Sequence, residues 1–184
     1  MKYLSLLLLF LFTLDLSAYT SNRGKFGVGV NFGNTMIKED NLSKNNVLLT
    51  GYELSYYASN YLVMKLGGSS SDNSEIKMER YDLGVDFKSS TSNMSPYFGL
   101  GVTLMTNELK GAYFGQNDTA MGVYGSGGID FSIEKKVLVS MEVQLTKAMS
   151  NTVDLGGGDE ITPVMDNASL MVKVKLLLGE GERR

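Results

Sequence analysis

The chain has 184 residues, with no cysteine, no histidine and a formal net charge of −3. Without cysteine an exported domain has no disulfides to hold it, and the slightly acidic balance provides no basic surface for nucleic acid. The absence of histidine removes the usual general base, and the absence of both residue types argues against a zinc or copper site.

The N-terminal residues predict a cleavable signal peptide. Met1-Lys2-Tyr3 supplies a basic start, residues 4–16 are mostly apolar, and Ala18 is a small residue at a cleavage position. The apolar run is shorter than the 20 or so residues that a membrane-spanning helix needs. We therefore expect residues 1–18 to be removed and residues 19–184 to form one domain. An uncleaved membrane anchor is the alternative.

Eight segments follow in which apolar residues recur at every second position. The fourth is the most regular, because Tyr81, Leu83, Val85 and Phe87 alternate with charged residues and glycine. A period of two predicts strands, and segments of about 10 residues separated by turns are typical of transmembrane strands. No further apolar run is long enough for a membrane helix, so only a closed sheet could enter a bilayer. The apolar positions span residues 26–32, 48–56, 62–66, 81–87, 98–104, 121–131, 137–145 and 168–176.

The connections between these segments alternate in length. Long polar stretches fall near residues 34–46, 68–78, 106–118 and 147–167, and shorter ones near 58–60, 88–95 and 132–136. Long loops on one rim and short turns on the other are typical of outer-membrane barrels. The sequence therefore predicts an all-β fold, a closed antiparallel transmembrane barrel of about eight strands in meander order.

The second face of the strands carries the charged residues. An eight-stranded barrel has room inside for little more than its own side chains, so we expect an interior salt-bridge network and no wide pore. Around a turn at residues 58–60, Tyr57 would pair with Tyr61, and Glu53 would then face Lys65 across the hairpin. The predicted interior network comprises Glu53, Lys65, Arg80, Asp82, Asp86, Asp130, Glu142, Lys173 and Lys175.

Outward aromatic residues gather at the ends of the strands that adjoin the short turns. Aromatic side chains are enriched where a barrel meets the lipid headgroups, whereas a soluble sandwich, the main structural alternative, has no reason to sort them to one level. The predicted aromatic girdle comprises Phe26, Tyr56, Phe87, Phe98 and Phe131.

The pattern resembles the small eight-stranded outer-membrane barrels, a family that includes the membrane domain of OmpA, OmpX and the opacity-type surface proteins. Residues 81–86 (YDLGVD) and 96–102 (PYFGLGV) look like strands of that family. The resemblance covers the whole mature chain and implies an outer-membrane location, contact with lipid and lipopolysaccharide, insertion by the barrel-assembly machinery, and long loops exposed to the outside.

No constellation of residues predicts catalysis, a metal site or a cofactor. Asp82, Asp86, Asp130 and Glu142 could in principle transfer protons, but inside a filled barrel we expect them to pair with lysine and arginine. We therefore predict a non-enzymatic structural protein whose loops contact host molecules, phage or other cells. A narrow gated channel is the second hypothesis, and a soluble periplasmic barrel that binds lipid is the third.

Overall fold

The computed structural model describes residues 22–37, 46–73, 76–89, 93–110, 117–149, 153–154, 160–161 and 166–179. The predicted signal peptide, residues 1–18, lies outside this range and stays a prediction. Among the described residues, no helix is long and apolar enough to cross a membrane.

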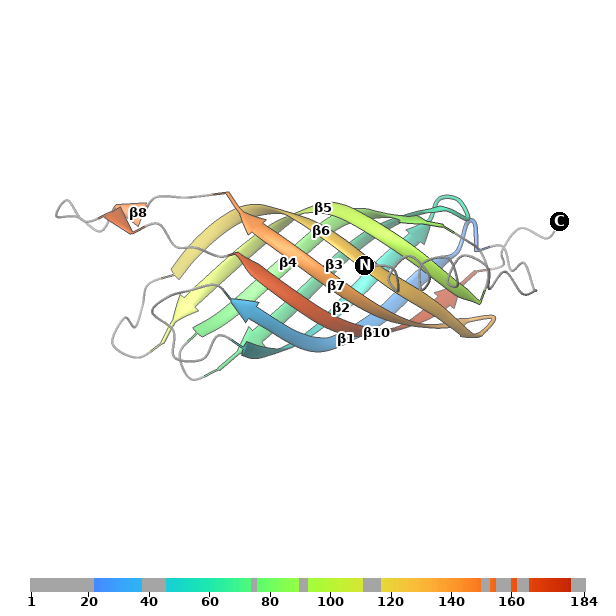
Figure 1. The fold of residues 1–184 in the computed structure, drawn as a ribbon, viewed down its shortest axis with the longest axis horizontal. Helices are drawn as coiled ribbons and strands as arrows, with labels where there is room; N and C mark the ends of the chain where they lie inside the picture. Colours follow the sequence, from blue (N-terminus) through green and yellow to red (C-terminus); the bar gives the residue numbers. More distant parts are fainter. Residues whose placement is uncertain are drawn as a thin grey trace, which may run out of the picture.

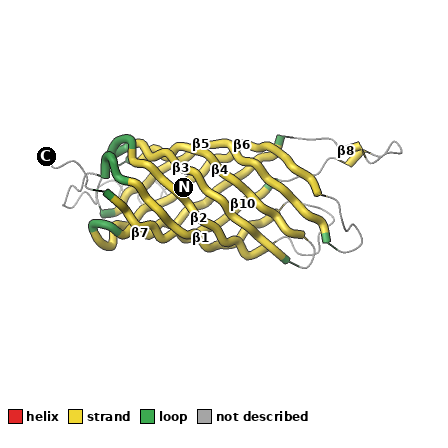
Figure 2. The backbone as a smooth tube through the Cα atoms, turned by 180° about the vertical axis from the view of Figure 1, so that it is seen from behind, coloured by secondary structure: helices red, strands yellow, loops and turns green. Residues whose placement is uncertain are grey.

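Eight long strands close into one antiparallel barrel (Figures 1 and 2). Each strand pairs with its neighbour in the chain, and the first long strand pairs with the last to complete the ring. The eight-stranded meander predicted from the sequence is confirmed, and a two-sheet sandwich is excluded. The long strands are β1 (Phe26–Ile37), β2 (Asn46–Tyr57), β3 (Leu62–Asp72), β4 (Ile76–Lys88), β5 (Met94–Leu109), β6 (Asn117–Glu134), β7 (Val137–Ala148) and β10 (Asn167–Leu178). Two-residue strands β8 (Val153–Asp154) and β9 (Glu160–Ile161) pair with each other between β7 and β10 in the sequence.

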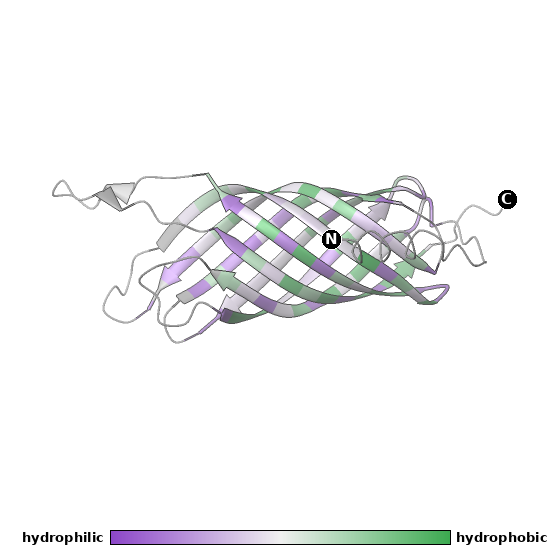
Figure 3. Cartoon of the chain, in the orientation of Figure 1, coloured by the Kyte–Doolittle hydropathy of each residue, from purple (hydrophilic) through white to green (hydrophobic). Residues whose placement is uncertain are grey.

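The alternation of residue types divides the barrel into two faces (Figure 3). On the outer face, Leu83 and Val143 are about half exposed, at 56% and 48%. On the inner face, Arg80 and Glu142 are each only 1% exposed. Soluble proteins place their residues the other way round, whereas an apolar outer face over a polar interior suits a barrel surrounded by lipid.

The two ends of the barrel differ in their connections. At one end, which we call the short-turn end, strands are joined through residues 58–61, 89–93 and 135–136. At the other, the loop end, the connections are 38–45, 73–75, 110–116 and the segment 149–166 that holds β8 and β9. The predicted long stretch at 68–78 is wrong, because only residues 73–75 separate β3 from β4. Residues 69–72 continue the ladder with β4, since a polar composition does not prevent backbone pairing beyond the apolar belt.

The predicted register of the β2–β3 hairpin is also wrong. Tyr57 pairs with Val63 instead of Tyr61, so Glu53 faces Gly67 and Lys65 faces Ser55. The turn is therefore two residues longer than we expected. A shift of two residues preserves the inward and outward faces, but it removes the direct opposition of Glu53 and Lys65.

Candidate functional site

Six charged side chains make a continuous series of contacts in the lumen, which we call the central ionic chain. All are at most 5% exposed, and charges so deeply buried need close partners and further hydrogen bonds. The members, in order of contact, are Asp86, Lys65, Glu142, Lys173, Glu53 and Lys175.

Glu142 on β7 lies at the centre of this chain. Its Oε2 atom lies 3.3 Å from Lys65 Nζ and 2.9 Å from Lys173 Nζ. The hydroxyl of Tyr97 donates a hydrogen bond of 2.7 Å to the same oxygen. Lys65 also lies 5.6 Å from the centre of the Tyr124 ring, a distance at which an ammonium group is attracted to the aromatic face.

Glu53 on β2 joins the chain to β10. Its two carboxylate oxygens lie 2.7 Å from Lys173 Nζ and 3.0 Å from Lys175 Nζ. Strand β1 runs between β2 and β10, and at this level its residue is Gly29, which pairs with Glu53 on one side and Lys175 on the other. A Cβ atom on Gly29 would lie 2.6 Å from Lys175 Cγ, so glycine provides the space through which the ion pair forms.

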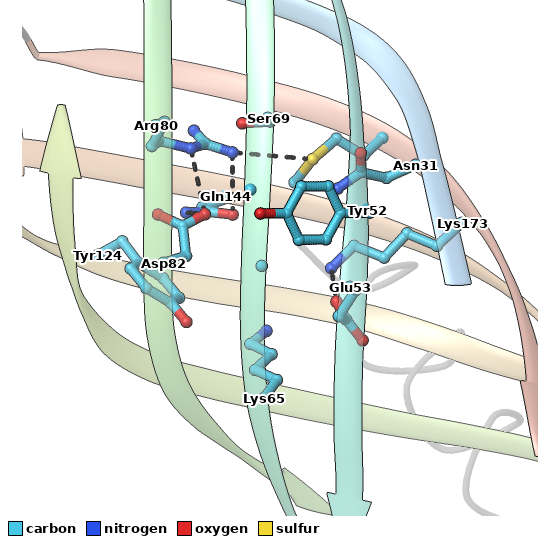
Figure 4. Close-up of a pocket in the computed structure, with 13 residues that line it drawn as sticks. Asn31, Tyr52, Glu53, Lys65, Ser69, Arg80, Asp82, Tyr124, Gln144 and Lys173 are labelled. Carbon is cyan, nitrogen blue, oxygen red and sulfur yellow. Dashed lines mark hydrogen bonds and ion pairs between the residues drawn. The ribbon is translucent and has the colours of Figure 1, made fainter. Parts of the chain in front are cut away.

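A second cluster surrounds Arg80, nearer the loop end. Arg80 Nε lies 3.1 Å from Asp82 Oδ2, and a terminal nitrogen donates to Gln144 (Figure 4). The other terminal nitrogen donates to Asn167 and Ser169. Gln144 in turn donates to Asp82 Oδ2 at 3.3 Å. The guanidinium group therefore links β4 to β7 and β10 across the lumen.

A third cluster lies nearer the short-turn end. Lys88 forms a close ion pair with Asp130, which also accepts a hydrogen bond from Ser140. Lys88 Nζ lies 5.0 Å from the centre of the Tyr57 ring. Lys88 was absent from the predicted network, although its position on β4, in phase with Asp86, would have identified it.

The structure places every charged residue of the predicted interior network inside the barrel. Glu53 and Lys65 were expected to face each other across the hairpin. Instead, Glu53 contacts Lys173 and Lys175 on β10. Lys65 contacts Asp86 on the neighbouring strand β4 and Glu142 on β7. The carboxylates Glu53, Asp82, Asp86, Asp130 and Glu142 each have a lysine or arginine partner within 4 Å. Among the described residues, no group of three or more acidic residues is placed to hold a metal ion.

Buried apolar side chains lie toward both ends of the lumen, a feature that the sequence prediction missed. At the short-turn end a buried cluster is formed by Tyr57, Val63, Leu138 and Leu177. At the loop end the buried inward residues are Val47, Leu49, Met78, Met105 and Ala120. The inward phase of the strands predicts these positions, but not that their side chains meet. Among the described residues of the loop end, Met105 and Ala120 pack together, and the polar side chains of Thr35 and Ser71 are buried there as well.

A small cavity lies beside the central ionic chain. It has a volume of about 20 Å³, measured as the space open to the centre of a water molecule. Figure 4 shows Asn31, Glu53, Lys65, Arg80, Asp82, Tyr124, Gln144 and Lys173 around it. This space is large enough for water, and it does not by itself form a continuous pore.

The aromatic residues of the predicted girdle lie at the short-turn end. Phe26 pairs with Tyr56 and Phe87 with Phe98, and the ring centres in each pair are 4.9 Å apart. Phe131, on β6, pairs with Met94 and Val139. The membrane role of these rings stays a proposal.

Comparisons with known proteins agree with this architecture. Residues 4–175 match the family model described as "Outer membrane protein beta-barrel domain". No curated protein matches the chain in sequence.

Several solved structures share the fold. The outer membrane protein OprG from Pseudomonas aeruginosa is 16% identical, with a TM-score of 0.64 over 89% of this chain and 100% of that one. Neisserial surface protein A is 11% identical, with a TM-score of 0.62 over 83% and 95%. Ail of Yersinia pestis, in complex with the heparin analogue sucrose octasulfate, is 12% identical, with a TM-score of 0.58 over 85% and 99%. At such identities these likenesses establish the fold alone.

Proposed function

Because the chain belongs to the outer membrane protein beta-barrel domain family, we propose that it is a non-enzymatic structural barrel that displays its loop end at the cell surface. Its location is the outer membrane, which disfavours the soluble periplasmic carrier. In this proposal residues 1–18 direct export and residues 19–184 form the barrel. The barrel-assembly machinery inserts it, and lipopolysaccharide surrounds its loop end.

The observation that carries this proposal is the closed interior. Charged clusters occupy the middle of the lumen, and buried apolar residues such as Leu138 and Met105 lie toward its two ends. A solute would have to displace these buried side chains and separate ion pairs that are buried from water, which is costly because each separated charge loses its partner. A filled barrel is suited to support loops rather than to conduct.

The same interior argues against an enzyme. Acid–base catalysis needs a group free to exchange a proton with a substrate. Here the described lumen carboxylates have cationic partners, and the cavity beside Glu53 and Lys65 is small. The function therefore depends on the surfaces outside the barrel.

A narrow gated channel is the competing function, and one observation favours it. Lys65 and Lys173 share Glu142, while each contacts a second carboxylate. Such shared partners could exchange without leaving a charge uncompensated. Planar-bilayer recordings of the refolded barrel separate the two functions, with a known porin in the same bilayer as the control. We expect no discrete openings, and reproducible openings would favour the channel.

The surface role is tested by replacing the loop-end connections 38–45 and 110–116, one at a time, with glycine–serine segments of equal length. Binding to lipopolysaccharide vesicles and to heparin is then measured, the latter because the similar protein Ail was solved with a heparin analogue. Heat-modifiable gel migration controls for folding. We expect at least one replacement to reduce binding in a barrel that still folds. Unchanged binding and unchanged envelope integrity in every variant would refute the surface role.

A further inference from the structure

Basic residues gather in one sector of the short-turn end, where β10 lies between β7 and β1. We call Arg23, Lys25, Lys135 and Lys136 the seam patch. We propose that the seam patch binds the phosphate group of an anionic phospholipid, whose acyl chains lie along the apolar outer face beside it. The proposal rests on the proposed function in one respect, since it takes the short-turn end to face the phospholipid leaflet of the outer membrane.

The fold brings the two halves of the seam patch together around the end of β10. The N–H of Leu177 donates to the Lys136 carbonyl oxygen at 2.8 Å, so the β6–β7 turn adjoins β10 on one side. On the other side Leu178 pairs with Phe26, the residue directly after Lys25. Figure 1 shows this turn and the start of β1 at the same end of the barrel as the end of β10. The lysines therefore flank β10 from both sides.

The seam patch carries an excess of positive charge. In its two segments, residues 22–25 and 134–136, the one acidic side chain is Glu134. The other short turns, residues 58–61 and 89–93, contain no charged residue. Lys88, which also lies near this end, is neutralised by Asp130, whereas none of the ion pairs between described residues includes Lys25, Lys135 or Lys136. The positive charge is thus concentrated in one sector.

Lys25 and Lys136 are close enough to repel each other. Lys25 is only 7% exposed, and its Nζ atom donates to Asn22 Oδ1 at 3.1 Å. Burial and the positive charge of Lys136 both lower the pKa of Lys25. A phosphate group beside the two lysines would offset this repulsion, because its oxygens accept charge-assisted hydrogen bonds from ammonium groups.

The outer surface beside the seam patch is apolar and exposed. Ile133 is 66% exposed, Phe26 58% and Leu178 53%. Phe26 also contacts Tyr56 within the predicted aromatic girdle. Aromatic side chains of membrane proteins lie at the level of the lipid headgroups, and lysines near the membrane surface are attracted to anionic lipids. An apolar surface bordered by positive charge is complementary to an anionic phospholipid.

The test measures the lipid selectivity of the refolded barrel. Electron spin resonance compares the association of spin-labelled phosphatidylglycerol and spin-labelled phosphatidylcholine with the protein in phosphatidylcholine vesicles. One lysine near an anionic lipid surface contributes about fivefold to association. We expect the wild-type barrel to prefer phosphatidylglycerol by about fivefold, and the double variant Lys135→Gln with Lys136→Gln to retain a preference of about twofold or less.

The matched control is the double variant Lys77→Gln with Lys110→Gln at the loop end. It removes the same charge, but from lysines that already have the carboxylate partners Glu79 and Asp72. We expect this control to keep the wild-type preference. Heat-modifiable migration confirms that each variant forms the closed barrel before its lipid selectivity is measured.

Three outcomes would overturn the proposal. The first is equal association of the two lipids with the wild-type barrel. The second is an equal loss of preference in both double variants, which would mean that selectivity follows net charge and not the seam patch. The third is loss of the preference when inorganic phosphate replaces chloride at equal ionic strength, which would identify a free anion as the occupant. None of these results affects the surface role of the loop end, because the loop replacements leave the seam patch unchanged.

Discussion

Replacing Glu142 with glutamine measures how much the central ionic chain stabilises the barrel. The substitution keeps the shape of the side chain and removes its charge. Lys65 then retains Asp86 at 2.7 Å, and Lys173 retains Glu53 at 2.7 Å, so neither lysine loses all its partners. Removing one partner of a buried ion pair costs about 3–5 kcal/mol. Because the second carboxylates remain, we expect a loss of about 2–4 kcal/mol.

The matched control is Glu79→Gln, the same chemical change in an exposed ion pair. Glu79 Oε1 lies 2.8 Å from Lys77 Nζ, and the two side chains are 40% and 38% exposed. Exposed ion pairs contribute little to stability, so the control should leave the midpoint of unfolding unchanged within error. The chain has no tryptophan, so urea unfolding in lipid vesicles is followed by far-ultraviolet circular dichroism and by gel migration.

Equal midpoints of unfolding for Glu142→Gln and Glu79→Gln would refute this prediction, because they would mean that a buried carboxylate stabilises the barrel no more than an exposed one. A change in the slope of the unfolding free energy against urea concentration would have a different meaning. Since that slope reports the surface exposed on unfolding, it would indicate a barrel whose lumen had already admitted water.

Three further predictions concern space, aromatic contacts and the lipid-facing surface. Gly29→Ala should destabilise the barrel by about 1–3 kcal/mol in the same urea assay, because the added Cβ would overlap Lys175, which pairs with Glu53. An unchanged midpoint of unfolding would show that the Lys175 side chain moves aside. A double-mutant cycle of Phe87→Ala and Phe98→Ala should give a coupling of about 0.5–1.5 kcal/mol, since the rings stack, and additive losses would contradict a direct contact. Met141→Arg, near the middle of the outer face of β7, should cost about 2–4 kcal/mol in vesicles, whereas Met36→Arg at the loop end should cost about 0–1 kcal/mol. Equal costs would contradict the assignment of the apolar belt.

The faces of the strands could be predicted from sequence because a period of two requires only local information. Leu83 and Asp82 are neighbours, and their opposite orientations follow from the geometry of any strand. The eight-stranded meander follows similarly from the number of alternating segments and the short connections between them. The β3–β4 connection was predicted too long because residues 69–72 are polar and do not alternate with apolar residues, yet they remain paired with β4.

The partners across the lumen could not be predicted in this way. Glu53 reaches Lys173 and Lys175, which lie 120 and 122 residues away, only because the last strand closes on the first. That contact depends on the register of two ladders and on Gly29 between them. Composition and alternation contain no such information. The apolar cluster of Tyr57, Val63, Leu138 and Leu177 was missed because single inward residues on different strands meet only in the closed barrel.

The contacts of Glu53 also bear on how the protein is assembled. Its lysine partners are on β10, the last long strand to leave the ribosome, and they reach it across the seam where β10 meets β1. Until that seam forms, a growing sheet would carry a carboxylate on β2 without these partners in an environment poor in water, which is unfavourable. The final strand therefore supplies charge neutralisation together with backbone pairing, and partly zipped sheets are disfavoured relative to the finished ring. Closure of the barrel should accordingly be a single cooperative event, because β10 pairs with β1 and neutralises Glu53 on β2 in the same step.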